Sequence, residues 1–198
     1  GPKIDVWEGA KTMEPKPEMA SLNAGIGAVL YKGLEMPILW TRSFIETNAK
    51  KMLDMGIKPE IEVYNTGMME DVYNLIEKGL LTKPDWFSFV MGMNRVNQGA
   101  VRYTPKLLAN YVDMLPDGAM FSTLGIMETE IQACTLAILL GGHVRVGFED
   151  NINYLKGQKA RDNAQLVSRI VMFGRELGRE IASPAEAREL LGIPSLKM

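Results

Sequence analysis

The chain has very little of the two residue types that build disulfides and most zinc sites. Its 198 residues contain one cysteine, Cys134, and one histidine, His143. One cysteine excludes a disulfide within the chain, and no HxH, HExxH or CxxC spacing can be written, so this chain alone cannot supply the usual three-ligand shell of catalytic zinc. Cys134 lies in the apolar stretch IQACTLAILL, which favours a buried helical position over a nucleophile.

An excess of one charge and long apolar runs are also lacking. The chain has 22 Lys and Arg against 24 Asp and Glu, which gives no electrostatic footprint for nucleic acid or an anionic membrane. The longest strongly apolar run, 136–140, is far too short to span a bilayer, and no signal-peptide pattern opens the sequence. We therefore expect a cytoplasmic protein without nucleic-acid or membrane partners, folded as a single domain over residues 1–198.

What is present is an alternation of short apolar segments with longer amphipathic ones. This order is typical of βα units and a parallel sheet, so the predicted fold class is α/β. The predicted strands are 18–23, 60–65, 86–92, 119–125 and 142–148. Helices are predicted from Ser43, Met68 and Thr104, and the SPAE sequence at Ser183 forms a capping box that starts another helix.

The segment GGHVRVGFEDN, residues 141–151, has ionisable groups where a buried strand usually carries only apolar ones. A period of two places on one face His143, Arg145, Gly147 and Glu149. The glycines before the segment and the acidic Glu149 and Asp150 at its end predict a strand that opens into a functional loop, as at the carboxyl-terminal mouth of an α/β barrel. The alternative is that the two carboxylates only cap a turn.

Two further strand ends present polar side chains. In PEMASLNAG, alternation places Ser21 and Asn23 on one face, where a hydroxyl and an amide suit recognition of a carboxylate or carbonyl, and Gly25 lets the backbone approach a ligand. In KPEIEVYNTG, a buried Glu62 must be paired or protonated, and Arg145 across the sheet is the natural partner. A purely structural ion pair in a barrel interior is the alternative.

Several segments together strongly resemble the β-keto acid cleavage enzyme family, almost end to end. They are PEMASLNAG, KPEIEVYNTGM, GGHVRVGFEDNINYLKG, DNAQLVSRI and LGREIASPAEARELLGI. The resemblance implies a zinc-dependent (β/α)8 TIM barrel that exchanges acyl groups between a β-keto acid and acetyl-CoA by retro-Claisen cleavage, yielding acetoacetate and a new acyl-CoA. It also implies that this chain covers about the last five βα units, because the family's HxH zinc pair and its Ser/Thr-Gly-Gly loop are not in it.

The resemblance further implies roles for individual residues. The implied catalytic residues are Arg145, Asp150 and Glu62, the implied zinc ligand is Glu149, and the implied substrate contacts are Ser21, Asn23 and Gly25. In this scheme zinc polarises the keto oxygen, Arg145 holds negative charge and Asp150 acts as a base near the scissile bond. His143 falls at a family position that is not a zinc ligand.

Two alternatives stay open. In the family interpretation, we expect the open strand edges to pair, giving a homo-oligomer or a complex with a complementing N-terminal half. The chain could instead be a catalytically inactive truncated barrel that uses these edges to pair with another protein or a second copy. It could also be an aldolase-like, metal-dependent barrel that works without CoA. Whether the chain binds a metal ion distinguishes the family enzyme from the first alternative. Whether turnover depends on acetyl-CoA distinguishes the family enzyme from the second.

Overall fold

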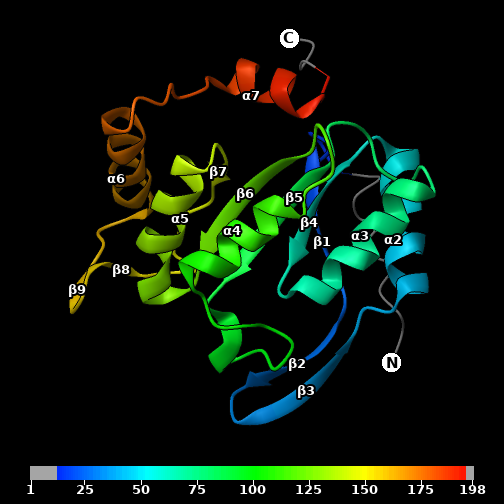
Figure 1. Cartoon of the computed structure of the whole chain (residues 1–198), viewed down its shortest axis with the longest axis horizontal. Coiled ribbons are helices and arrows are strands. Elements are labelled where there is room, and N and C mark those ends of the chain that lie inside the picture. The colour runs from blue at the N-terminus through cyan, green and yellow to red at the C-terminus, as the bar shows by residue number, and fades with distance from the viewer. Residues whose placement is uncertain (1–12, 195–198) are drawn as a thin grey trace.

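A parallel five-stranded sheet is the centre of the molecule (Figure 1). The computed structural model describes residues 13–194. The strands lie in the order β1 (Met19–Asn23), β4 (Lys58–Val63), β5 (Trp86–Met91), β6 (Met120–Gly125) and β7 (His143–Val144). Because all pairs are parallel and the sheet order follows the chain order, the predicted α/β class and the five predicted strands are confirmed. Closure into a barrel stays a prediction.

Four helices lie between successive strands of the parallel sheet, and two more follow its last strand. Along the chain they are α2 (Arg42–Met55), α3 (Met69–Glu77), α4 (Pro105–Asp113), α5 (Glu130–Leu139), α6 (Asn163–Glu176) and α7 (Pro184–Leu191), with short 3-10 turns η1 (Thr66–Met68), η2 (Met93–Arg95) and η3 (Met127–Thr129). The four predicted helices are confirmed to within about a turn, and the capping box at Ser183 is present in full. Within residues 13–194, no helix is long and apolar enough to cross a membrane.

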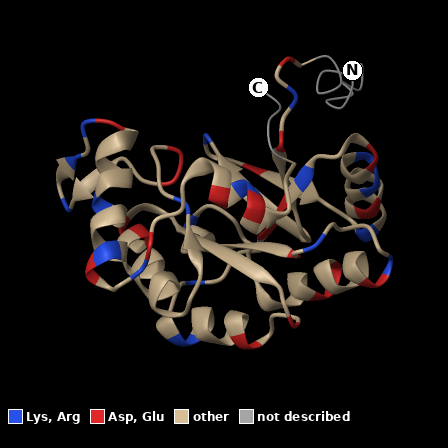
Figure 2. Cartoon of the chain, turned by 90° about the horizontal axis from the view of Figure 1, so that it is seen from above, with Lys and Arg blue, Asp and Glu red and all other residues tan. Residues whose placement is uncertain are grey.

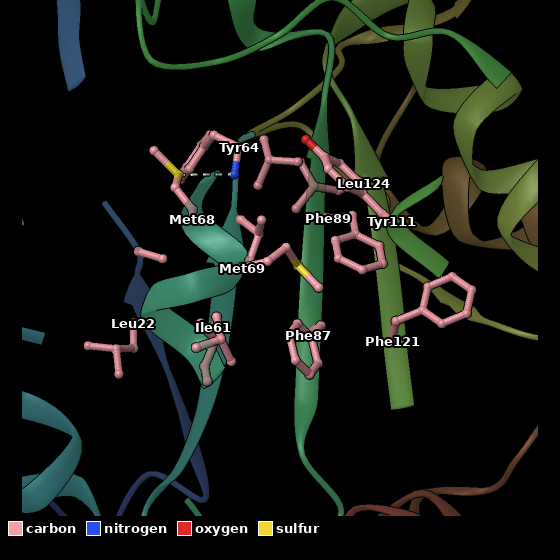
Figure 3. Packing of buried hydrophobic residues seen from close by; sticks show 14 of the residues in the cluster. Leu22, Ile61, Tyr64, Met68, Met69, Phe87, Phe89, Tyr111, Phe121 and Leu124 are labelled. Atoms are coloured by element: carbon pink, nitrogen blue, oxygen red, sulfur yellow. Dashed lines mark hydrogen bonds between the residues drawn. The ribbon is translucent and has the colours of Figure 1, made fainter. Parts of the chain in front are cut away.

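The main hydrophobic core lies between the sheet and helices α2 to α5. Alternate residues of each strand point into it, as Figure 3 shows for Ile61, Phe87, Phe89 and Phe121. The ring of Phe89 is the centre of an aromatic cluster, with ring centroids 4.9 Å from Tyr111, 5.6 Å from Phe121 and 6.2 Å from Phe87. Burying each such ring contributes about 1.5–3 kcal/mol, so this side of the sheet supplies much of the stability.

Cys134 belongs to a smaller cluster under α6. Its side chain is fully buried, and the thiol lies 3.6 Å from the carbonyl oxygen of Thr123. Burial raises the pKa of the Cys134 thiol, which keeps it protonated and poorly nucleophilic. The prediction that Cys134 is a core residue is confirmed.

Two β-hairpins are not among the predicted elements. The first consists of β2 (Ile26–Tyr31) and β3 (Leu34–Leu39), and it projects beyond the main sheet (Figure 1). Its two-residue turn has Lys32 at φ 49° and Gly33 at φ 79°, the left-handed pair that matches the twist of a tight hairpin. The second consists of β8 (Asn153–Leu155) and β9 (Gln158–Lys159).

The last strand of the sheet ends earlier than predicted. Only His143 and Val144 pair with β6, and one more backbone bond, from the Arg145 N–H to the Thr123 carbonyl, follows. The N–H groups of Asp150 and Asn151 then both donate to the carbonyl of Gly147, which turns the chain. The two-residue alternation therefore does not extend to Glu149, which lies beyond that turn.

Candidate active site

Arg145 is the centre of a charged cluster at the carboxyl ends of the strands. Its Nε and Nη2 donate to the two carboxylate oxygens of Asp150, each at 3.1 Å, and its Nη1 donates to Oε1 of Glu62 at 2.9 Å. Both carboxylates are largely buried. The guanidinium therefore joins the end of β4 to the loop after β7, and the predicted pairing of Glu62 with Arg145 is confirmed.

The ionisation of this cluster follows from burial and from its mixed charges. Figure 2 shows acidic and basic residues adjoining one another among the strands. Burial raises the pKa of Asp150, while the hydrogen bonds and charge of Arg145 oppose that shift. Burial alone would lower the pKa of Arg145, but its carboxylate partners outweigh burial and hold that pKa above its ordinary value. Arg145 thus stays a fixed cation that orients the Asp150 carboxyl group.

Tyr64 is a member of the cluster that the sequence patterns did not indicate. Its hydroxyl oxygen lies 2.6 Å from Oε2 of Glu62 and 2.5 Å from Oδ1 of Asn23. A tyrosine has one hydroxyl proton, so it donates to one of these two acceptors at a time. Burial and the charge of Glu62 raise the pKa of Tyr64, so it remains a donor at neutral pH. Tyr64 therefore links the predicted substrate contact Asn23 to the predicted catalytic Glu62.

A row of polar side chains continues from the cluster across the sheet, on the side opposite the helices α2 to α5. Ser88 donates a 3.0 Å hydrogen bond to Glu60, and the hydroxyls of Ser122 and Ser88 lie 3.2 Å apart. Glu60 lies 3.7 Å from Nη1 of Arg145. Burial raises the pKa of Glu60, and the hydrogen bond from Ser88 opposes the shift. The sheet therefore offers a third carboxyl group beside Arg145, in addition to those of Glu62 and Asp150.

Glu60 and Ser122 of this row line a cavity of about 690 Å³ on the open side of the sheet. Its walls include Ser21, Glu60, Trp86, His143 and Arg145. The ring of His143 lies 5.3 Å from that of Trp86, and burial lowers the pKa of His143. The structure thus brings the predicted substrate contact Ser21 and the predicted catalytic Arg145 to one cavity, with an uncharged imidazole between aromatic and polar groups.

Gly25 has a packing reason for being glycine. Its φ is 79°, and a Cβ built there would lie 2.5 Å from Cγ of Met68. Met68, near the start of the helical segment after β4, therefore occupies the space that a side chain at position 25 would need. The predicted role of Gly25 in substrate contact is not tested by this packing.

Glu149, the implied zinc ligand, is set apart from the buried carboxylates. Its side chain is 84% exposed and Oε2 lies 3.6 Å from Nη2 of Arg145. Within residues 13–194, no three His, Cys, Asp or Glu side chains are grouped so that they could hold a metal ion. One exposed carboxylate beside an arginine is a poor donor set for zinc, so the described residues by themselves do not fit the metal.

The fold and the charged cluster define an α/β protein with a buried arginine–carboxylate cluster at the carboxyl ends of its parallel strands. A family model described as beta-keto acid cleavage enzyme matches residues 5–193. The chain belongs to the beta-keto acid cleavage enzyme family, which confirms the family resemblance of its motifs.

Curated relatives extend this similarity. The chain is 39% identical over 178 residues to a 3-keto-5-aminohexanoate cleavage enzyme of Acetoanaerobium sticklandii, covering 90% of this chain and 63% of the relative. It is 32% identical over 187 residues to a 3-oxoadipate:acetyl-CoA acetyltransferase of Cupriavidus necator, covering 92% of this chain and 63% of the relative. The chain thus spans less than two thirds of the length of these relatives.

A solved structure shares the fold. It is described as a ternary complex of ObcA with a C4-CoA adduct and oxalate, and its TM-score is 0.69 at 22% sequence identity. The match covers 90% of this chain and 46% of that one. At this identity the likeness concerns the arrangement of helices and strands.

Proposed function

We propose that the complete protein is a β-keto acid cleavage enzyme that condenses a β-keto acid with acetyl-CoA and releases acetoacetate and a new acyl-CoA. The observation that carries this proposal is the Arg145 cluster with Glu62 and Asp150 in a member of this family. The names of three relatives support the co-substrate, since each pairs a keto acid with acetyl-CoA: 3-oxoadipate, 3-dehydrocarnitine and 3,5-dioxohexanoate.

Each residue of the cluster has a proposed task. Asp150 acts as the base that removes a proton beside a keto group, and Arg145 holds it in place through two parallel hydrogen bonds. The guanidinium charge also stabilises negative charge that grows on the substrate oxygen in the transition state. Glu62 accepts a hydrogen bond from the third guanidinium nitrogen, Nη1, and so holds Arg145 in place, and Tyr64 in turn orients Glu62.

Substrate contacts are proposed on β1, beside this cluster. Ser21 lies in the cavity wall and its hydroxyl can donate to a carboxylate or carbonyl oxygen. Asn23, at the end of the same strand, and Gly25 after it lie next to Tyr64 and Met68. We propose that these three residues contact the β-keto acid, with Ser21 as the group that meets it most directly.

Zinc enters the proposal only for the complete enzyme, where Glu149 would supply one oxygen ligand and polarisation of the keto oxygen would be the chemistry added. The other ligands would come from outside the described residues. We therefore expect a preparation of these 198 residues alone to lose zinc on dialysis. Metal analysis tests this, and stoichiometric zinc bound through Glu149 in protein of verified mass would contradict it.

The activity is tested by mixing a panel of β-keto acids with acetyl-CoA and measuring acetoacetate and the new acyl-CoA. The enzyme would be a form that spans the full length of the curated relatives. Omitting acetyl-CoA is the control, because an aldolase-like barrel would turn over without it. Product formation that is independent of acetyl-CoA would reject the proposed function.

A further inference from the structure

Glu130 is a buried carboxylate outside the Arg145 cluster. It is the first residue of α5, which packs against β6 and β7 (Figure 1), and it is 4% exposed. A Cβ built at Gly125 would lie 2.5 Å from the Cα of Glu130, so the start of the helix lies directly against the end of β6. Burying a carboxylate costs free energy unless its oxygens find partners. The partners of Glu130 therefore show what it does.

The hydrogen bonds of Glu130 hold both ends of the turn that carries Asp150. Its Oε1 accepts a 2.9 Å hydrogen bond from the side-chain amide of Asn151, and its Oε2 accepts a longer one, 3.4 Å, from the N–H of Gly147. The N–H groups of Asp150 and Asn151 both donate to the Gly147 carbonyl, which closes the turn. One carboxylate thus fixes residues 147–151 to α5.

The donors on this turn require an acceptor. Nδ2 of Asn151 also donates to the carbonyl of Asn153 at 2.7 Å, and Oδ1 of Asn151 accepts from the N–H of Asn153 at 2.9 Å. Every polar group of the Asn151 side chain is therefore engaged, and its orientation is fixed. Burial raises the pKa of Glu130, while the hydrogen bonds from Asn151 and Gly147 oppose that shift. An ionised carboxylate accepts on both oxygens, as this arrangement requires.

We infer that Glu130 is a positioning residue, which acts through Gly147 and Asn151 to hold the carboxyl group of Asp150 against Arg145. The inference rests on the proposed role of Asp150 as the base. Both hydrogen bonds between Asp150 and Arg145 measure 3.1 Å, and a displacement of about 1 Å would break them. A misplacement of that size can cost about a hundredfold in rate. The alternative is that Glu130 only stabilises the start of α5 through its negative charge.

The test compares Glu130→Ala with Asp85→Ala in the acetyl-CoA-dependent assay, in a form that spans the full length of the curated relatives. Asp85 is the matched control because it is also a buried carboxylate, 1% exposed and paired with Lys83, but it precedes β5 at the opposite end of the sheet. We expect Glu130→Ala to lower kcat about tenfold or more and to leave KM for the β-keto acid within about threefold. Asp85→Ala should lower the melting temperature and leave kcat near that of wild type.

Two further variants separate positioning from helix stability. Glu130→Gln keeps the volume and one acceptor oxygen, so it should recover most of the kcat lost in Glu130→Ala. Asn151→Ala removes the shorter hydrogen bond and should lower kcat by a similar factor, and the double alanine variant should lose little more, because either substitution breaks the same contact. The 2.8 Å bond from the Met127 N–H to the Asp150 carbonyl remains in all of them, which favours a shifted turn over an unfolded one.

Amide hydrogen exchange of residues 147–151 gives a measurement that does not depend on activity. Relative to the amides of α3, exchange in this segment should accelerate about tenfold or more in Glu130→Ala and should not change in Asp85→Ala. A wild-type enzyme without acetyl-CoA-dependent turnover would reject the proposed function, and hydrogen exchange alone would then decide the positioning role. Unchanged exchange in Glu130→Ala would overturn the inference. So would a kcat equal to that of Asp85→Ala, or a Glu130→Gln variant as impaired as Glu130→Ala.

Discussion

The two faces of the parallel sheet differ although the same strands build both. On β5, Phe87 and Phe89 point into the core under the helices, while Ser88 between them points to the cavity side. On β4, Ile61 is in the core while Glu60 and Glu62 surround Arg145. Alternate residues of one strand therefore have two different roles. Residues on one face stabilise the fold because they bury apolar area, and residues on the other face hold charges that must be paired.

The largest expected effect is on the packed face. Phe89→Ala removes the ring at the centre of the aromatic cluster and should lower the free energy of unfolding by about 3–5 kcal/mol, because the cavity left behind cannot close fully. Urea unfolding measures the change. Phe148→Ala, at a partly exposed position in the loop after β7, is the control and should cost less than about 1 kcal/mol. Equal losses of unfolding free energy in the two variants would contradict the claim that the packed face supplies much of the stability.

On the charged face, Arg145→Ala should affect chemistry more than folding. We expect turnover of the complete enzyme to fall about a hundredfold or more, equivalent to about 3 kcal/mol in the activation free energy, because a donor to the developing charge is lost. Asp150→Asn should behave similarly, and Glu62→Gln should be milder. The measurements are acetyl-CoA-dependent acetoacetate formation and the melting temperature of each variant.

The control for this prediction is Arg188→Ala. Arg188 also pairs with a carboxylate, Glu18, at 2.7 Å, but it lies on α7 away from the cluster. Its replacement should leave turnover nearly unchanged. If Arg145→Ala kept near-normal turnover while its melting temperature fell sharply, Arg145 would be a structural ion-pair partner and the site assignment would be wrong.

A smaller loss of stability is expected from alanine substitutions at Gly25 and Gly33, and comparing the two separates the cost of backbone strain from the cost of a packing collision. Gly25 and Gly33 share a φ of 79°, but a Cβ at Gly25 would collide with Met68 whereas nothing lies within 4 Å of one at Gly33. Gly33→Ala should therefore cost about 1 kcal/mol for its left-handed backbone, and Gly25→Ala about 1–3 kcal/mol more for the collision. Thermal unfolding of the two variants checks this. Equal costs would mean that Met68 moves aside freely.

The smallest expected effect concerns the pH dependence of Glu60. Burial raises its pKa in the folded chain, so the unfolded chain ionises first as the pH rises above about 4, and folding loses stability there. Glu60→Gln lacks this titration and should gain stability relative to wild type as the pH rises above the ordinary pKa of glutamate, about 4.

Glu18→Gln should show the opposite trend. The hydrogen bond from Arg188 lowers the pKa of Glu18 in the folded chain, so its stabilising contribution is present above the ordinary pKa of glutamate and is lost as the pH falls. The variant should therefore lose stability relative to wild type as the pH rises. Unfolding curves measured at several pH values compare the two variants, and trends in the same direction would contradict one of the two assignments.

Much of the architecture was predictable because its signals are local. The predicted strands 18–23, 86–92 and 119–125 match β1, β5 and β6 within a residue or two, and the predicted pairing of Glu62 with Arg145 follows from the cost of burying a lone carboxylate. The β2–β3 hairpin was missed although Lys32-Gly33 between two apolar segments was its signal. Tyr64 had no such signal, since its role depends on Asn23, 41 residues away.

The sequence by itself determined the alternation of strands and helices, the family and the residues able to carry charge at the strand ends, because periodicity, caps and motifs are read from neighbouring residues. Only the tertiary structure decided that Asp150 is buried against Arg145 while Glu149 next to it is exposed. The reason is the turn at Gly147, whose carbonyl accepts two N–H groups and points consecutive carboxylates in different directions. A pattern with a period of two continues only as long as the strand does.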